Sequence, residues 1–196
     1  MSRRLIALAA LALCLTATGL AHAASAVRYQ EAKAAKAAPA ATAVLLKKAQ
    51  ASAKEQGKNV LLIFHASWCK WCHRLDAFMA DERVKSIFEA NFVPVRITVQ
   101  ESEDKKSDEN PGGMDVMSAL GGAKAGLPFF AILDTSGKPI MSSIRPAVGD
   151  DQGGNTGFPA VSEEIDHFLK MLRAGAPKIS DAQLELIKQV LSEKKS

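Results

Sequence analysis

The chain has 196 residues and a formal net charge of +4. This length suffices for one domain with a sizeable apolar core. The charge is too small to indicate binding to nucleic acid or to a membrane surface, and it falls to +2 if Arg3 and Arg4 are removed with a leader. We therefore expect no nucleic-acid partner.

The N-terminus has the features of a secretory signal peptide. Two arginines precede the apolar run Leu5–Leu15, and the sequence AHA, ending at Ala23, offers the small residues that a signal peptidase recognises. We expect residues 1–23 to be the signal peptide and the mature protein to be periplasmic or secreted; an uncleaved anchor is the alternative. Residues 24–41 are rich in Ala and Lys without a sustained apolar face, which predicts a flexible leader. The predicted domain spans 42–196.

Hydrophobic patterns in this domain alternate between those of strands and those of helices. Val60–Ala66 is a continuous apolar run, typical of a central strand buried on both faces. In the first half of the domain we expect a helix over 42–56, the strand 60–66, a helix that breaks near Asp81, and a strand over 92–99 with Pro94 at an edge or bulge. A surface loop over 101–113, a short helix over 114–120, a hairpin of strands 128–134 and 138–144, and a loop over 149–157 should follow. We expect two helices at the end, one with an apolar face from Val161 to Leu172 and one over 180–193 that starts with a capping box at Ser180. This order predicts an α/β fold with a mixed central sheet flanked by helices and with extra N- and C-terminal helices.

Without the signal peptide the chain keeps two cysteines, Cys69 and Cys72. In an oxidising compartment two cysteines this close would pair with each other. A bridge across so short a loop stabilises a fold little, so reactivity explains the pair better than a structural role. The stretch CKWC has the CxxC spacing of a redox-active dithiol, and with His73 it also matches the CxxCH signature of c-type haem attachment.

The position of Cys69, where the buried strand meets the next helix, favours a nucleophile. A helix N-terminus supplies partial positive charge and free N–H groups, which lower the pKa of a thiol, and Lys70 adds a positive charge. Trp68 and Trp71 can form an apolar collar that excludes water and offers a docking surface. Cys72, one turn later, is placed to resolve a mixed disulfide by attacking it. We predict Cys69 and Cys72 as catalytic residues, and Trp68, Lys70 and Trp71 as substrate-binding residues.

Two histidines are candidates for tuning the reactive thiol. His65 lies four residues before Cys69 at the end of the strand, where it could adjust the thiolate or shuttle a proton. His73 falls on the helix face opposite the buried stripe, so we expect it to point toward solvent. The alternative for both is an ordinary packed or solvated histidine.

The stretches LLIFHASWCKWC and AGLPFFAILDTSGKPI resemble the thioredoxin superfamily, in which a strand runs into Trp-Cys-x-x-Cys and a proline-containing segment leads into a hairpin. The resemblance covers roughly residues 42–173, and the WCxWCH form is most similar to extracytoplasmic thioredoxin-like proteins of bacteria. It implies a thioredoxin-like fold and a disulfide-exchange site in which Cys69 attacks and Cys72 resolves. It also implies a cis peptide bond before Pro128 and a substrate chain that pairs with the backbone of Leu127, which adds both residues to the substrate-binding set.

The resemblance further implies a thiol:disulfide oxidoreductase, and we favour reduction of disulfides in partner proteins. We expect a monomer with no metal and no cofactor besides the Cys69–Cys72 disulfide, and an unidentified redox partner that can be membrane-bound. Lys70-Trp71 replaces the Gly-Pro of typical cytoplasmic thioredoxins, and Ile63 stands where those proteins place a buried acid that assists proton transfer. Since Lys70 stabilises a thiolate and so favours an oxidising couple, oxidase and isomerase activities stay open.

Two other functions fit parts of the motif. Copper(I) delivery could use both thiolates with His65 or His73, although no Met-rich or His-rich tract accompanies them. Haem attachment at CKWCH would need a second axial ligand, for which Met79, Met114 and Met117 are available, and a small helical fold. The predicted strands fit such a fold badly.

Overall fold

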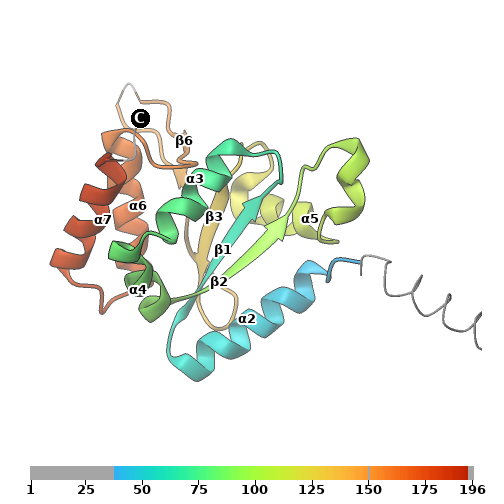
Figure 1. The fold of residues 1–196 in the computed structure, drawn as a ribbon, viewed down its shortest axis with the longest axis horizontal. Helices are drawn as coiled ribbons and strands as arrows, with labels where there is room; N and C mark the ends of the chain where they lie inside the picture. The colour runs from blue at the N-terminus through green and yellow to red at the C-terminus, as the bar shows by residue number, and fades with distance from the viewer. Residues whose placement is uncertain (1–37, 150, 194–196) are drawn as a thin grey trace, which may run out of the picture. The chain divides into compact units, whose positions relative to one another are not determined.

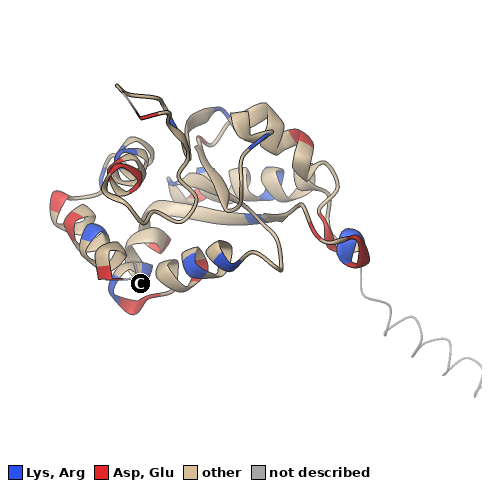
Figure 2. Cartoon of the chain, turned by 90° about the horizontal axis from the view of Figure 1, so that it is seen from above, with Lys and Arg blue, Asp and Glu red and all other residues tan. Residues whose placement is uncertain are grey.

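The structure, a computed structural model, describes residues 38–149 and 151–193. The predicted signal peptide and residues 24–37 of the predicted leader lie outside the described residues. Within the described ranges, none of the helices is both long and apolar enough to cross a membrane. Figure 2 shows that charged residues of both signs are spread over the helices and loops, while the apolar residues form the interior.

A four-stranded mixed sheet lies at the centre of the fold (Figure 1). Its strands are β1 (Asn59–His65), β2 (Phe92–Thr98), β3 (Phe129–Leu133) and β4 (Pro139–Ser142). Their order is β2-β1-β3-β4, with β1 parallel to β2 and antiparallel to β3, and with β3 antiparallel to β4. The predicted mixed sheet and its β3–β4 hairpin are therefore confirmed.

Strand β1 lies inside the sheet because both of its faces are apolar. Residues 60–64 are all buried, and since side chains alternate along a strand they enter two cores. Leu61 and Ile63 belong to the core on one face, and the even-numbered residues of this run belong to the core on the other. Strand β2 is at the sheet edge, which is where a strand tolerates a proline such as Pro94.

Helices cover both faces of this sheet (Figure 1). They are α2 (Thr42–Gln56), α3 (Lys70–Met79), α4 (Glu82–Asn91), α5 (Gly113–Met117), α6 (Ser162–Gly175) and α7 (Asp181–Glu193), together with a 3₁₀ helix over Glu103–Asp108 and a π-helical turn over Ser118–Gly122. Side chains of α3, α4, α6 and α7 pack in one core, and those of α2 and α5 pack in the other. The extra helices predicted at both ends are α2 and α7.

Capping residues explain where the helices begin and end. Gly57, with a left-handed φ of 64°, ends α2. Asp81 is the N-cap of α4 and accepts a hydrogen bond from the Arg83 N–H. Before α7, Ser180 Oγ accepts from the Gln183 N–H and Gln183 Oε1 accepts from the Ser180 N–H, which is a capping box. These three predicted boundaries are confirmed.

The segment 149–157, predicted as a loop, contains a strand instead. Strand β6 (Gly154–Asn155) pairs antiparallel with β5 (Ile144–Arg145) in a second, two-stranded sheet. Gly149 and Gly153 adopt positive φ values of 60° and 69°, which lets the chain reverse between these strands. We call residues 144–155 the accessory hairpin.

Two further predictions about exposure are wrong. Val161 does not lie on the buried face of α6 but is its N-cap, with 51% of its surface exposed. The segment 101–113 is not a plain surface loop, because it includes the 3₁₀ helix and because its first residue, Glu101, is buried. This second difference bears on the site.

Candidate active site at the Cys69–Cys72 disulfide

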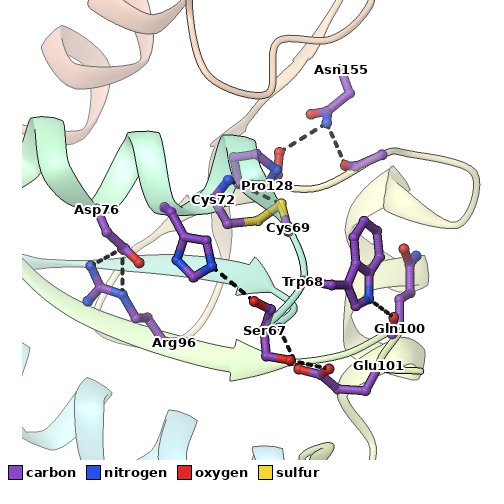
Figure 3. Close-up of a disulfide and its surroundings, with 12 residues drawn as sticks. Ser67, Trp68, Cys69, Cys72, Asp76, Arg96, Gln100, Glu101, Pro128 and Asn155 are labelled. Carbon is purple, nitrogen blue, oxygen red and sulfur yellow. Dashed lines mark hydrogen bonds and ion pairs between the residues drawn. A yellow bond between two sulfur atoms is a disulfide. The ribbon is translucent and has the colours of Figure 1, made fainter. Parts of the chain in front are cut away.

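The Cys69–Cys72 disulfide lies where β1 leads into α3 (Figure 3). Cys69 is the N-cap of α3, and its Sγ accepts a hydrogen bond of 3.1 Å from the Cys72 N–H. The first N–H groups of a helix have no partner within the helix and carry partial positive charge. Cys69 Sγ therefore lies where these groups can stabilise a thiolate, and the predicted junction of strand, CxxC and helix is confirmed.

Both cysteines are almost completely covered by the protein. Cys69 exposes 3% and Cys72 exposes 2% of its surface. They pack with Ala66 and with the partly buried Leu127. The disulfide is thus shielded from bulk solvent, and the segments around it control which molecules can reach it.

The loop that precedes β3 packs against the disulfide. Its Leu127–Pro128 peptide bond is cis, as the thioredoxin resemblance implies, and Leu127 contacts the cluster of the two cysteines. Figure 3 shows Pro128 beside the sulfur atoms. We call residues 126–128 the cis-proline loop. The structure therefore places the predicted substrate-binding pair next to the predicted catalytic pair.

Both tryptophans of the motif are exposed beside the disulfide. Trp68 exposes 58% and Trp71 exposes 46% of its surface. Trp68 Nε1 donates to the Gln100 carbonyl at 2.7 Å, and Trp71 stacks on Phe158 with ring centroids 6.2 Å apart. Lys70, also exposed, is the first residue of α3. The rings are held in place with apolar surface open to a partner, which fits the predicted collar and leaves its substrate-binding role a prediction.

A buried carboxylate, missed in the sequence, holds the chain just before the disulfide (Figure 3). Glu101 is only 4% exposed, and its oxygens accept hydrogen bonds from the Ser67 N–H at 2.6 Å and the Ser67 Oγ at 2.8 Å. Because β1 and β2 are parallel, with His65 opposite Thr98, residues that follow the two strands meet at one end of the sheet. Parallel pairing was the signal that could have revealed Glu101.

Gln100 adopts a backbone conformation that supports this contact. Its φ of 55° is uncommon for a residue with a side chain. Its carbonyl accepts from Trp68, while the Glu101 N–H that follows donates to Glu109 Oε1 at 2.7 Å. These bonds compensate for an unfavourable φ. We call Gln100–Glu101 the carboxylate clamp.

The two candidate histidines bond to groups other than the cysteines. His73 Nε2 lies 2.9 Å from the Ser67 carbonyl oxygen, and His65 Nε2 lies 3.4 Å from Thr98 Oγ1. His73 is exposed, as predicted, and His65 is half-buried. Burial lowers the pKa of His65 below its ordinary value, which favours the neutral imidazole. A role for either residue in tuning the thiol stays a prediction.

A second anchor, also missed in the sequence, comes from the accessory hairpin. Asn155 Nδ2 donates to the Gly126 carbonyl at 2.7 Å and to the Pro128 carbonyl at 3.0 Å (Figure 3). Its Oδ1 accepts from Ser143 Oγ at 2.7 Å. We call Asn155 the amide clamp. In the sequence it is one residue of a Gly-rich stretch, and nothing there distinguishes it.

A cleft of about 310 Å³ lies beside the cis-proline loop. Its lining includes Trp71 from α3 and Leu127 from the cis-proline loop. It also includes Asn155 from the accessory hairpin, and Thr156 and Phe158 from the residues after it. Polar and aromatic groups therefore share one hollow next to the disulfide.

The site can also be compared with the copper and haem alternatives. Within the described part of the chain, no group of three or more His, Cys, Asp or Glu side chains is placed to hold a metal ion. The CKWCH stretch belongs to a mixed sheet with helices, which differs from the small helical fold that haem attachment led us to expect.

These features define the class of the protein. A mixed sheet of order β2-β1-β3-β4, a CxxC disulfide at the start of the helix after the central strand, and a cis-proline loop packed against it are the features of the thioredoxin-fold thiol–disulfide oxidoreductases. The family model described as thioredoxin-like matches residues 40–135, which include the disulfide and the cis-proline loop. Residues 40–135, which carry the site, are therefore thioredoxin-like. The accessory hairpin, α6 and α7 follow the matched residues.

Several solved structures are similar to the chain. A disulphide isomerase from Xylella fastidiosa Temecula1 is 20% identical over 74% of this chain and 87% of its own, with a TM-score of 0.43. A DsbH oxidoreductase is 15% identical over 72% of this chain and 85% of its own, with a TM-score of 0.43. The oxidised C-terminal domain of DsbD from Neisseria meningitidis is 24% identical over 54% of this chain and 86% of its own, with a TM-score of 0.37. A comparison with curated protein sequences found no match.

Proposed function

We propose that this protein is a periplasmic or secreted thiol–disulfide oxidoreductase that reduces disulfides in partner proteins, with Cys69 attacking and Cys72 resolving. The position of the disulfide carries the proposal. Cys69 Sγ accepts the Cys72 N–H at the start of α3, and the cis-proline loop packs against both cysteines. A bridge with a sequence separation of 3 adds little stability, so reactivity accounts better for its placement among helix N–H groups.

The exchange proceeds in two steps that transfer two electrons. The Cys69 thiolate of the reduced protein attacks one sulfur of a partner disulfide, so that a mixed disulfide forms and the other partner sulfur leaves as a thiolate. Cys72, as a thiolate, then attacks Cys69 Sγ, and the second partner sulfur leaves. The products are a partner with two thiols and the Cys69–Cys72 disulfide that the structure contains. A dithiol reductant must then restore the reduced protein.

The surrounding residues have separate tasks in this mechanism. The N–H groups at the start of α3 and the charge of Lys70 stabilise the thiolate of Cys69. Trp68 and Trp71 offer exposed apolar surface to the partner. Ile63 is buried in the apolar core and cannot take a proton, so the proton of Cys72 passes to water or to another group.

The compartment and the direction of exchange follow from weaker signals. The predicted signal peptide directs the protein out of the cytoplasm, where disulfides persist. Reduction there requires a supply of electrons, for which we propose a membrane-bound redox partner. The thioredoxin resemblance supports reduction, whereas Lys70 favours an oxidising couple.

Reduction of insulin disulfides by dithiothreitol tests the proposed function. We expect the protein to accelerate the precipitation of insulin chains and expect Cys69→Ser, which keeps the size of the side chain, to lose this effect. Cys72→Ser is the matched control, because it keeps the attacking cysteine and should form mixed disulfides without turnover. Equal rates for the wild type and Cys69→Ser would contradict the proposal.

A further inference from the structure

We infer that Asn155 of the accessory hairpin is a positioning residue, which holds the cis-proline loop so that Leu127 can bind the backbone of a substrate polypeptide. The inference rests on the proposed function, since it concerns the substrate of the same site. It predicts that this site discriminates polypeptide disulfides from small-molecule disulfides. Asn155 lies beyond the residues 40–135 that the family model matches.

The hydrogen bonds of Asn155 hold two backbone carbonyls of the cis-proline loop and do not involve the backbone of Leu127. Its Nδ2 group donates to the carbonyls of Gly126 and Pro128, the two residues that flank Leu127. Within residues 38–149 and 151–193, neither the N–H nor the C=O of Leu127 is hydrogen-bonded to another group of the chain. Asn155 therefore fixes the backbone on both sides of Leu127 and leaves the polar groups of Leu127 for an extended chain, which can pair with them as an added strand does.

The orientation of the Asn155 side chain is itself determined by a hydrogen bond with a buried serine. Ser143, with no exposed surface, donates from Oγ to Asn155 Oδ1 and accepts at Oγ from the Phe130 N–H at 3.0 Å. Thr156, the next residue, binds the Ser143 carbonyl through both its N–H and its hydroxyl. The amide clamp is thus tied to the central sheet through Ser143 and β3. Its carboxamide cannot rotate without losing the hydrogen bond from Ser143 Oγ.

The cleft beside this loop gives the hairpin a second contact with a substrate. Asn155, Thr156 and Phe158 line the cleft together with Leu127 and Trp71. A polypeptide that pairs with Leu127 would lie along the cleft, where the side chains next to its cysteine would meet these residues. A small disulfide has no backbone to pair with Leu127 and too few atoms to use the cleft.

The test compares two disulfide substrates and three variants. The substrates are a peptide with one internal disulfide and hydroxyethyl disulfide. Asn155→Ala removes the amide, and Asn155→Asp keeps its shape and its acceptor for Ser143 but loses both donors. Asn59→Ala is the matched control, because Asn59 Nδ2 also donates to a backbone carbonyl, that of Gly175 at 2.8 Å, but at the other end of β1.

Both Asn155 variants should lower kcat/KM for the peptide by about 10-fold, mainly through a higher KM, as expected for the loss of one or two hydrogen bonds at a binding loop. Both should keep kcat/KM for hydroxyethyl disulfide within about 2-fold of the wild type, because the peptide-specific contacts are not used. Asn59→Ala should keep the wild-type ratio of the two values, even where its thermal stability falls as much. A merely structural role of Asn155 would leave this ratio unchanged.

The outcomes separate this inference from the proposed function. If the wild type reduces both substrates and the Asn155 variants keep the wild-type ratio, the inference is overturned while the proposed function stands. If the wild type reduces neither substrate, the proposed function fails, and the inference fails with it. A lower peptide rate in the Asn155 variants with an unchanged rate for the small disulfide supports both.

Discussion

Two clamps hold the backbone on opposite sides of the disulfide, and they use opposite chemistry (Figure 3). On the side of the cysteines, the carboxylate of Glu101 accepts from the Ser67 N–H and hydroxyl. On the side of the cis-proline loop, the amide of Asn155 donates to the carbonyls of Gly126 and Pro128. The difference follows from what each segment presents, which is the N–H and hydroxyl of Ser67 on one side and two backbone carbonyls of the cis-proline loop on the other.

This contrast assigns a different part of the reaction to each clamp. The carboxylate clamp holds the turn that carries the proposed attacking cysteine, so we expect it to affect every substrate and the stability of the oxidised protein. The amide clamp holds the loop for which we propose binding of a substrate chain, so we expect it to affect polypeptide substrates alone. Changes on the two sides should therefore have separable effects.

The largest effect on activity should come from removing the thiol of Cys69. Cys69→Ser should abolish disulfide exchange with every substrate, because no thiolate remains to attack. Cys72→Ser should instead accumulate a mixed disulfide at Cys69, detectable by mass spectrometry with a disulfide-containing peptide. A peptide adduct on Cys72 in the Cys69→Ser variant, at the yield of the Cys69 adduct, would reverse our assignment of attacking and resolving residues.

Loss of the carboxylate clamp should have the next largest effect. Glu101→Ala leaves the Ser67 N–H without its acceptor, which should lower the free energy of unfolding by about 1–3 kcal/mol. Glu101→Gln is the control, because its carbonyl can still accept from that N–H, and it should lose less than half as much. Urea unfolding of the oxidised proteins measures both. Wild-type stability of Glu101→Ala would show that this buried carboxylate does not anchor the turn.

A double variant tests whether the two sides are independent. Glu101 and Asn155 share no bonding partner, so the losses in unfolding free energy of Glu101→Ala and Asn155→Ala should add to within about 0.5 kcal/mol. Urea unfolding of the two single variants and the double variant gives the difference. A departure above about 1 kcal/mol would mean that the clamps cooperate through the disulfide.

The smallest effect should be a pH dependence from His65. Burial lowers the pKa of His65 in the folded protein, so the unfolded chain takes up this proton at a higher pH than the folded one. As the pH falls below about 6.5, the ordinary value for histidine, protons bind preferentially to the unfolded state and stability decreases. His65→Gln, which does not titrate, should lose less stability than the wild type between pH 7.5 and 5. Equal losses would show that His65 does not contribute.

Features whose signal lies within a short stretch of the chain could be predicted from the sequence. The apolar run 60–66 predicted the central strand, the residues at Asp81 and Ser180 predicted helix starts, and the cysteine spacing with the thioredoxin resemblance predicted the disulfide and the cis bond before Pro128. Each of these signals lies within a few residues of what it predicts, or in a stretch typical of the family.

Both clamps were missed because they depend on tertiary pairing. Glu101 is 34 residues from Ser67 in sequence, and its environment follows from the parallel pairing of β1 with β2. Asn155 is 29 residues from Gly126, and it reaches the loop only because the accessory hairpin forms. A charged stretch and a Gly-rich stretch are each typical of solvated loops, so their composition concealed the buried Glu101 in one and the half-buried Asn155 in the other.

The reduction potential of the Cys69–Cys72 pair tests the central claim most directly. Equilibration of the protein with glutathione or dithiothreitol buffers, followed by alkylation and mass spectrometry, gives the fraction of disulfide at each potential. A reversible couple used in exchange should titrate between about −270 mV, near thioredoxin, and about −120 mV, with the lower value expected for a reductase. A potential below about −300 mV, typical of a structural disulfide, would contradict the account.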